Sequence, residues 1–433
     1  MIAFKTLARA FAVAAVACAT TVTMAVVPAG AAAATPNAGA TVHLRTVPLT
    51  IVNKSGRGKM FVFVYGTYNG TSYYVTHPAG TVSTFPDSTS YQAYGLGFGN
   101  KKTVTIRVPE MMNTRVYVSY GRKMKFTSAG GVPSTPSGWS RSDPTGAKNP
   151  NFRTLFDWFE YSWGPQPAPV PPQLPANATY LNGNQTQVDM FGLPMLFTFV
   201  GVDANNNPVT LRGGFKSAKA RQRIFAAMKK AGAPWKRLVI GGGNKTPLRV
   251  ISPYNGISMG VFPSDQFDGY INSVWAKYTG AGAAKTIVAK TTGPSQSFTG
   301  AVSGTDLVFT RQGAGGTVTF AKPTTMQAYQ AWAPTLSPSG DADLQTGAGE
   351  LMTMVQATLM RTTMLARNTI SACPATTAYY TNAPVNMYAK TIHRYAYQRL
   401  AYGFGFDDVC NQGSDQQVFQ PSRVILTIQP LNK

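Results

Sequence analysis

Apolar and polar residues alternate with a period of two over much of residues 40–125, and this alternation restricts the fold more than any other feature of the chain. The segments 103–108 and 115–120 show it clearly, and Gly, Asn and Pro interrupt it at short intervals. Short alternating strands separated by turns indicate an antiparallel sandwich or barrel. The same alternation returns at 423–428, so we expect a last strand that rejoins the N-terminal sheet.

The middle of the chain has the periodicity of helices instead. A short apolar run at 238–240 predicts a strand there, and Ser217 is the expected cap of the first helix. Apolar residues at helical spacing predict four helices, over about 217–231, 264–278, 351–359 and 386–395. The expected fold class is therefore mainly β with an α/β insertion.

The first 34 residues have the features of a signal peptide. Lys5 and Arg9 precede an apolar stretch over 10–27, and small residues follow with an A-x-A-type cleavage site near Ala33 and Ala34. We therefore expect a secreted, extracellular protein. The stretch is of marginal length and rich in Ala and Thr, so no stable membrane insertion is expected.

The pattern beyond this signal predicts two domains. A β sandwich or barrel domain covers 40–200 and is completed by 385–433, and a mixed α/β domain covers 201–384. Some 400 residues exceed the usual size of a single core, which agrees with this division.

Cysteine and histidine are scarce beyond the signal. Only Cys373 and Cys410 remain, and two cysteines in an oxidising compartment usually pair, so we expect a disulfide. The sequence has no H-x-x-x-H or C-x-x-C spacing, so neither a metal site nor a cofactor is expected. His393 lies among aromatic residues in a helical pattern, which is typical of a structural histidine.

The chain carries a formal net charge of +23, although charged residues make up only 13% of it. This balance suits anionic cell walls, acidic polysaccharides or nucleic acid, and it also keeps a secreted protein soluble. A nucleic-acid-binding protein would interleave aromatic residues with Lys and Arg. Here the aromatic clusters at 152–163 and 379–406 coincide with acids and amides as often as with basic residues, so nucleic acid is not an expected partner.

Glutamate is rarer still, because the chain has only Glu110, Glu160 and Glu350. Glu110 follows a predicted strand end, and Glu350 is expected to open a helix, where its charge favours the helix dipole. Glu160 lies inside the aromatic run 155–163, where an ordinary solvated glutamate would be out of place. It is therefore the candidate for a chemical role.

Glycoside hydrolysis needs one carboxylic acid to protonate the leaving oxygen and a second carboxylate to activate water or to attack. In an extended segment Trp158, Glu160 and Ser162 share one face, whereas Asp157 lies on the other. The partner is therefore expected on a neighbouring strand, and the next acid is Asp189. Apolar neighbours would disfavour the ionised form of Glu160, which suits an acid, whereas Asp189 follows amides and a hydroxyl and should stay ionised as a base.

Several motifs resemble the bacterial glycoside hydrolase family 64 β-1,3-glucanases, laminaripentaose-producing enzymes of the thaumatin-like superfamily. The resemblance runs from about residue 47 to the C-terminus. It is carried by Phe-Asp-Trp-Phe-Glu-Tyr-Ser at 156–162, by the segment 184–194 that ends in Val-Asp-Met-Phe-Gly-Leu-Pro, and by 249–253, 270–278 and 402–409.

The resemblance implies a thaumatin-like β barrel beside a mixed α/β domain, with a wide groove between them for the glucan. It also implies inversion, with Glu160 as general acid and Asp189 as general base, and release of short oligosaccharides such as laminaripentaose by a monomer. The residues expected to contact sugar are Trp158, Ser162, Asn184, Thr186, Asp407 and Asp408. For Asp407 and Asp408 the sequence leaves open a second role, the capping of a turn before Cys410.

Two features depart from the family pattern. The Pro-rich segment 164–176 lengthens the connection between the two catalytic segments, and we interpret it as a surface loop rather than a linker. Asn182 occupies a position where an aromatic platform is expected. These departures keep an alternative open, a non-catalytic thaumatin-like protein that binds glucan or acts against fungi.

Overall fold

The computed structural model describes residues 44–431 apart from 135–147, 168, 242–246, 331–334 and 337–340, and the side chains of 335 and 336 are also left undescribed. The predicted signal peptide lies outside the described residues.

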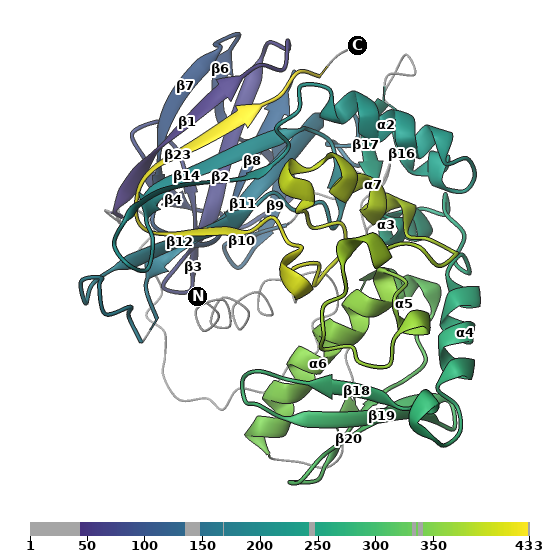
Figure 1. Cartoon of the computed structure of the whole chain (residues 1–433). Helices are drawn as coiled ribbons and strands as arrows, with labels where there is room; N and C mark the ends of the chain where they lie inside the picture. The colour runs from purple at the N-terminus through teal and green to yellow at the C-terminus, as the bar shows by residue number, and fades with distance from the viewer. Residues whose placement is uncertain are drawn as a thin grey trace.

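Twelve of the described strands form one large sheet (Figure 1). Nine follow one another in the order β15-β14-β23-β12-β11-β8-β2-β3-β4, while β6 pairs with β2, and β1 pairs with both β23 and β7. A small sheet with the order β10-β9-β5 lies beside them. Their bounds are β1 Thr46–Asn53, β2 Met60–Tyr68, β3 Thr71–Val75, β4 Val82–Thr84, β5 Ser88–Tyr94, β6 Leu96–Gly99, β7 Thr103–Pro109, β8 Met112–Tyr120, β9 Met124–Ala129, β10 Val132–Pro133, β11 Leu155–Pro165, β12 Thr179–Asn184, β14 Met195–Val202, β15 Pro208–Gly214 and β23 Gln416–Ile428.

The C-terminal strand β23 rejoins the N-terminal sheet, as the sequence predicted, and the structure places it between other strands. Its first residues pair with β12, and its second half lies between β14 and β1, parallel to β1 with Ile51 opposite Leu426. Gln420, at the junction of the two halves, has a φ of 45°. The strands curl around a core of alternate residues such as Leu49, Phe159 and Phe197, which are fully buried.

The segment between β15 and β23 forms a helical lobe with two further small sheets, of order β13-β17-β16 and β18-β19-β20-β21-β22, the first of which takes β13 from the segment before β14 (Figure 1). The bounds are α2 Ala220–Lys230, α3 Pro253–Ser258, α4 Asp268–Lys277, α5 Thr325–Gln330, α6 Ala342–Met360, α7 Met387–Tyr395, β13 Met190–Phe191, β16 Val239–Gly241, β17 Pro247–Ile251, β18 Ile287–Lys290, β19 Ser297–Ser303, β20 Asp306–Arg311, β21 Thr317–Phe320 and β22 Thr335–Leu336. One continuous apolar cluster joins Tyr117 and Trp158 of the large sheet to Ile271 and Leu351 of this lobe. The face of the sheet that carries Trp158 therefore packs partly against the helical lobe.

Four helices lie close to their predicted positions, but two details differ. The N-cap of α2 is Lys219, two residues after the expected cap, and the Ser217 hydroxyl accepts a hydrogen bond from the Lys219 N–H rather than from the first turn. Glu350 does not open a helix: α6 begins eight residues earlier at Ala342, and the Glu350 carboxylate accepts hydrogen bonds from Thr292.

The Pro-rich segment is a loop of the sheet, as predicted, since it joins β11 and β12, which are paired neighbours. Leu174 of this segment and Ala178 just after it pack with Tyr180 and Phe419. The sheet itself continues to Gly214 and resumes at Gln416, so it extends beyond the boundary expected at 200.

Candidate active site

A row of polar side chains crosses three neighbouring strands. Arg115 on β8 lies opposite Glu160 on β11, and Glu160 lies opposite Asn184 on β12. Two residues further along, Ser162 lies opposite Asn182. Residues directly opposite each other in paired strands share a face of the sheet, and all five side chains are partly exposed. They form a polar strip on the sheet.

Glu160 has charged and polar partners rather than the apolar surroundings that the sequence predicted. Its Oε1 lies 2.8 Å from Nε of Arg115, and the indole Nε1 of Trp158 donates a hydrogen bond of 3.0 Å to the same oxygen. The Glu160 side chain is 26% exposed, so it is open to a ligand on the strip.

The prediction that Trp158 contacts sugar does not agree with the structure. Its side chain is 1% exposed and is packed between Tyr117 and Phe156, with the Arg115 guanidinium 5.6 Å from its ring. Trp158 therefore presents no free face, and its contribution is the hydrogen bond that orients Glu160. The period of a strand shows which residues share a face, but it does not show whether another layer covers that face.

The sequence had suggested that Asp189 lies on a strand next to that of Glu160. In the structure Asp189 lies in the segment just before β13 and not on a strand of the large sheet. Its backbone carbonyl accepts hydrogen bonds from the Ser252 N–H (2.9 Å) and from Nδ2 of Asn255 (3.0 Å). The same Nδ2 lies 3.4 Å from the Asp189 carboxylate. Ser252 caps α3, so this short helix holds the residue in place.

Burial raises the pKa of Asp189 above its ordinary value. The positive charge of Arg115 and the hydrogen bond from Asn255 oppose that rise, while the negative charge of Glu160 adds to it. The expectation that amides and a hydroxyl would leave Asp189 readily ionised therefore omitted its burial. Arg115 interacts with both carboxylates and is the cation that Glu160 and Asp189 share.

Asp157 ties the strand of Glu160 to the segment of Asp189. Its buried carboxylate accepts hydrogen bonds from the backbone N–H groups of Gly192 (2.8 Å) and Leu193 (2.9 Å). Burial raises the pKa of Asp157 to about 7, although three backbone N–H donors and the charge of Arg249 oppose the rise. The sequence assigned Asp157 to the opposite face from Glu160, and its place beneath the site agrees with that.

The amide side chains before Asp189 differ in burial and in hydrogen-bond partners. Gln185 and Gln187 are buried and bind backbone carbonyls, whereas Asn184 stays partly exposed on the strip. Thr186 is 9% exposed, and its hydroxyl accepts a 3.3 Å hydrogen bond from the Val188 N–H. Of the predicted sugar contacts, the structure brings Ser162 and Asn184 together beside Glu160.

Known β-1,3-glucanases are similar to this chain over most of its length. The family model described as Glyco_hydro_64, Beta-1,3-glucanase, matches residues 45–428. The chain belongs to glycoside hydrolase family 64. Proteins named glucan endo-1,3-beta-glucosidase from Arthrobacter sp. (strain YCWD3) and Cellulosimicrobium cellulans are each 30% identical over 372 residues. These matches cover 84% of this chain and 61% of each relative, so the chain spans about three fifths of the length of these relatives.

Two solved structures share the family 64 fold with this chain. A laminaripentaose-producing beta-1,3-glucanase in complex with laminaritetraose is similar with a TM-score of 0.73 and 28% identity, covering 89% of this chain and 99% of that one. A beta-1,3-glucanase domain from Clostridium beijerinckii gives a TM-score of 0.66 at 21% identity, covering 90% of this chain and all of that one.

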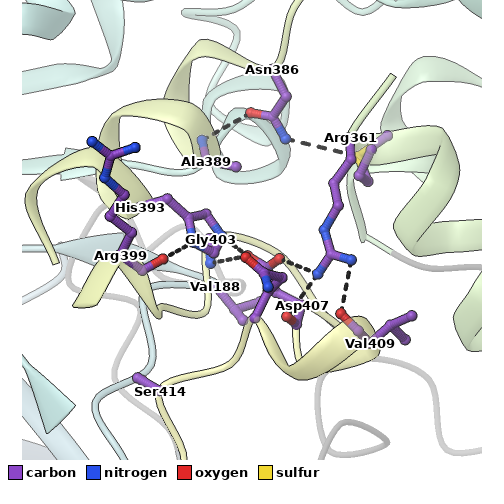
Figure 2. A network of polar contacts seen from close by, with 12 residues as sticks. Val188, Arg361, Asn386, Ala389, His393, Arg399, Gly403, Asp407, Val409 and Ser414 are labelled. Atoms are coloured by element: carbon purple, nitrogen blue, oxygen red, sulfur yellow. Dashed lines mark hydrogen bonds and ion pairs between the residues drawn. The ribbon is translucent and has the colours of Figure 1, made fainter. Parts of the chain in front are cut away.

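Asp407 of this family 64 chain is a structural residue and not the sugar contact that the sequence suggested. It is completely buried, and its carboxylate lies 2.8 Å from Nη2 of Arg361, 2.7 Å from Nε2 of His393 and 2.9 Å from the Gly403 N–H. Figure 2 shows that these groups surround the carboxylate. Asp408 is partly exposed and occupies the N-cap position of a 3₁₀ turn at Val409–Asn411, but its side chain makes no capping hydrogen bond there, so the structure does not show the capping role that the sequence left open.

Sequence reasoning missed two tyrosines that extend the strip. Tyr65 on β2 lies opposite Arg115, and Tyr74 on β3 lies opposite Tyr65. Both are partly exposed, and the Tyr65 ring stacks on buried Tyr117 with their planes 10° apart. The strip of the family 64 chain therefore continues from the carboxylates onto aromatic surface. Because both residues belong to ordinary alternating strands, only the register of the sheet could have identified them.

The remaining expectations concern cross-links, metals and membranes. Cys373 and Cys410 form a disulfide with their Cα atoms 5.5 Å apart, as predicted. Within the described ranges, no group of three or more His, Cys, Asp or Glu residues is placed to hold a metal ion. No helix in that same part of the chain is long and apolar enough to cross a membrane.

Proposed function

We propose that this protein is a secreted glycoside hydrolase that cleaves β-1,3-glucan with inversion and releases short oligosaccharides of the laminaripentaose type. The observation that carries the proposal is the ion pair of Glu160 with Arg115 on the partly exposed polar strip, since the charges of both residues also act on the pKa of Asp189. Membership of family 64 and the printed activities of the relatives support it. The non-catalytic alternative is not favoured, because the relatives of this family 64 chain are named as glucanases.

In the proposed mechanism, the polar strip holds the sugar through Ser162 and Asn184. Glu160 donates a proton to the leaving oxygen, and Asp189 removes a proton from the water that attacks the anomeric carbon. The Arg115 guanidinium lies against the Glu160 carboxyl group, so the leaving oxygen of the sugar has to displace Arg115 to reach the acid. Movement of Arg115 towards Asp189 would release the acid and hold the base ionised in one step.

The architecture completes the proposal. We assign a thaumatin-like β domain to residues 44–214 with 416–431 and a mixed α/β domain to 215–415, with the glucan in a groove between them. Export through a signal peptide cleaved near Ala33 and Ala34 and action as a monomer belong to the same proposal. The Pro-rich loop and Asn182 lie at the β11–β12 pair, so product length is the property most open to difference from the relatives.

The test is incubation of the mature protein with insoluble β-1,3-glucan, followed by chromatography of the soluble products. We expect short β-1,3-linked oligosaccharides; binding to the solid without soluble product would instead support the non-catalytic alternative. With a soluble oligosaccharide, proton NMR should show the α-anomer first. Asp189→Asn should lose turnover and regain part of it with azide, forming an α-glycosyl azide, because azide attacks without a base. Initial release of the β-anomer, or a covalent sugar on Asp189, would contradict inversion.

A further inference from the structure

Three turns at one end of the large sheet carry a cluster of cations. The turns join β1 to β2, β6 to β7 and β8 to β9, and the registers bring them to the same end, since Met60 pairs with both Gly99 and Tyr120, and Val52 with Thr103. This end also meets the end of β23 in Figure 1, because the Lys54 N–H binds the Ile428 carbonyl. The barrel-end basic cluster consists of Lys54, Arg57, Lys59, Lys101, Lys102, Arg122 and Lys123.

The charges of this cluster are exposed to solvent. All seven side chains are exposed, and the turns 54–59, 100–102 and 121–123 contain no Asp or Glu. None of the ion pairs found among the described residues involves a member of the cluster. Ordinary protein surfaces intersperse charges of both signs, because clustered like charges repel one another. A cluster of one sign is therefore a feature that an anionic partner would stabilise.

The cluster lies apart from the carboxylates. Glu160 is five residues along β11 from Leu155, which pairs with Tyr120 at the basic end. At a rise of about 3.3 Å per residue the separation along the strand is roughly 17 Å. A partner on the cluster would therefore leave the polar strip open to a second polysaccharide.

The composition of the cluster indicates the kind of partner. Five of its members are lysines, which act as flexible point charges, and no aromatic residue lies in the three turns to stack on bases. Charges spread over three turns suit a polymer with repeated charges better than one small anion. We infer that this end of the protein docks on a carboxylate-bearing anionic polysaccharide and so holds the enzyme on a mixed wall while the strip cleaves neutral glucan. The choice of a polysaccharide rests on the proposed function.

The test compares two variants with the same net charge. One replaces Lys54, Lys101, Lys102 and Lys123 by Gln. The control replaces four exposed lysines of the helical lobe by Gln, namely Lys229, Lys236, Lys290 and Lys322. Binding to polygalacturonate is measured by titration at 50 and 200 mM salt, with duplex DNA at equal charge concentration as a second arm and hydrolysis of soluble β-1,3-glucan as a measure of intact fold.

We expect the wild type and the control variant to bind polygalacturonate at 50 mM salt and to lose at least about tenfold in affinity at 200 mM, because exposed charges are screened. The cluster variant should bind at least tenfold more weakly at 50 mM and hydrolyse soluble glucan normally. An equal loss of affinity for polygalacturonate in both variants would show that net charge alone causes the binding. Tighter binding of DNA than of polygalacturonate would show that the cluster does not prefer a polysaccharide. Either result would overturn the inference. Binding is measured without turnover, so failure of the proposed hydrolysis would be seen separately.

Discussion

Replacement of Asp407 by Asn tests whether this residue supports the fold or contacts sugar. The change keeps the size of the side chain and removes its negative charge. Arg361, whose side chain is 2% exposed, would then remain buried without the carboxylate 2.8 Å away. His393 and the Gly403 N–H would lose their acceptor as well.

Loss of one partner from a buried ion pair costs about 3–5 kcal/mol, because the other charge stays desolvated. The entropy of unfolding is about 2.1 cal/mol/K per residue, which gives roughly 0.8 kcal/mol/K for some 400 residues. The expected fall in the melting temperature is therefore about 4–6 °C for cooperative unfolding. Hydrolysis of a soluble oligosaccharide at 25 °C should change by less than about threefold, since Asp407 has no exposed surface to offer a sugar.

The pH dependence provides a second readout. Burial would raise the pKa of Asp407, but the charges of His393 and Arg361 outweigh burial and lower it. A lowered pKa in the folded state stabilises the protein above the unfolded value of about 3.9, and this stabilisation is lost as the pH falls through the folded value. The stability difference between wild type and variant should shrink as the pH falls below about 4. An unchanged melting temperature with a raised KM would refute the structural role and restore the sugar contact.

Three further changes test the site and the cross-link. Glu160→Gln should lower kcat by about 10²–10⁴-fold while glucan still binds, because the amide has no proton to transfer; steady-state kinetics and a pull-down on insoluble glucan measure this. Asn255→Leu should raise the pKa of Asp189 further by removing a donor to its carboxylate, so the acid side of the rate profile should move to higher pH, with a severalfold loss at pH 5 and little loss at pH 8. Replacing Cys373 and Cys410 by Ser should destabilise the fold by roughly 4 kcal/mol, since the bond closes a loop of 37 residues, and a thermal melt measures the loss.

Each of these changes has a control or a contrary outcome. Glu350→Gln removes a carboxylate from the helical lobe and should leave kcat unchanged; near-normal turnover of the Glu160 variant would remove its role as acid. Ser258→Ala alters an exposed residue of the same helix as Asn255 and should leave the pH profile in place. An equal loss at all pH values in the Asn255 variant would indicate general damage to the site. Two free thiols in the unreduced protein would contradict the disulfide.

The sequence alone predicted the elements whose periodicity is local. The strands near 103–108 and 115–120 and the helix at 386–395 lie where alternation or helical spacing placed them. Asn386 even caps its helix by accepting a hydrogen bond from the Ala389 N–H. The small number of glutamates was equally informative. Glu160, the one of the three that lies in an aromatic segment, has a partly exposed side chain on the sheet.

Contacts between distant segments were beyond that reasoning. Arg115 and Asn255 lie 45 and 95 residues from Glu160 in the sequence, and only the strand register and the packing of α3 bring them to the carboxylates. Trp158 was assigned to the correct face, but the side chains that bury it include Tyr117 and Arg115 of the neighbouring strand β8. Asp407 was misjudged for the same reason, since its partners Arg361 and His393 belong to two different helical segments.

The position of β23 has a consequence for how the protein is made. Strand β1 emerges from the ribosome early, yet its parallel partner is synthesised some 375 residues later, since Leu49 pairs with Val424. Until then β1, β12 and β14 lack the strand between them, and unpaired edges of this kind promote aggregation. Chains that end before about residue 424 cannot complete the sheet, even if their helical lobe has folded. The sheet can therefore close only after β23 has been translated, and until then the nascent chain needs protection from aggregation with other chains.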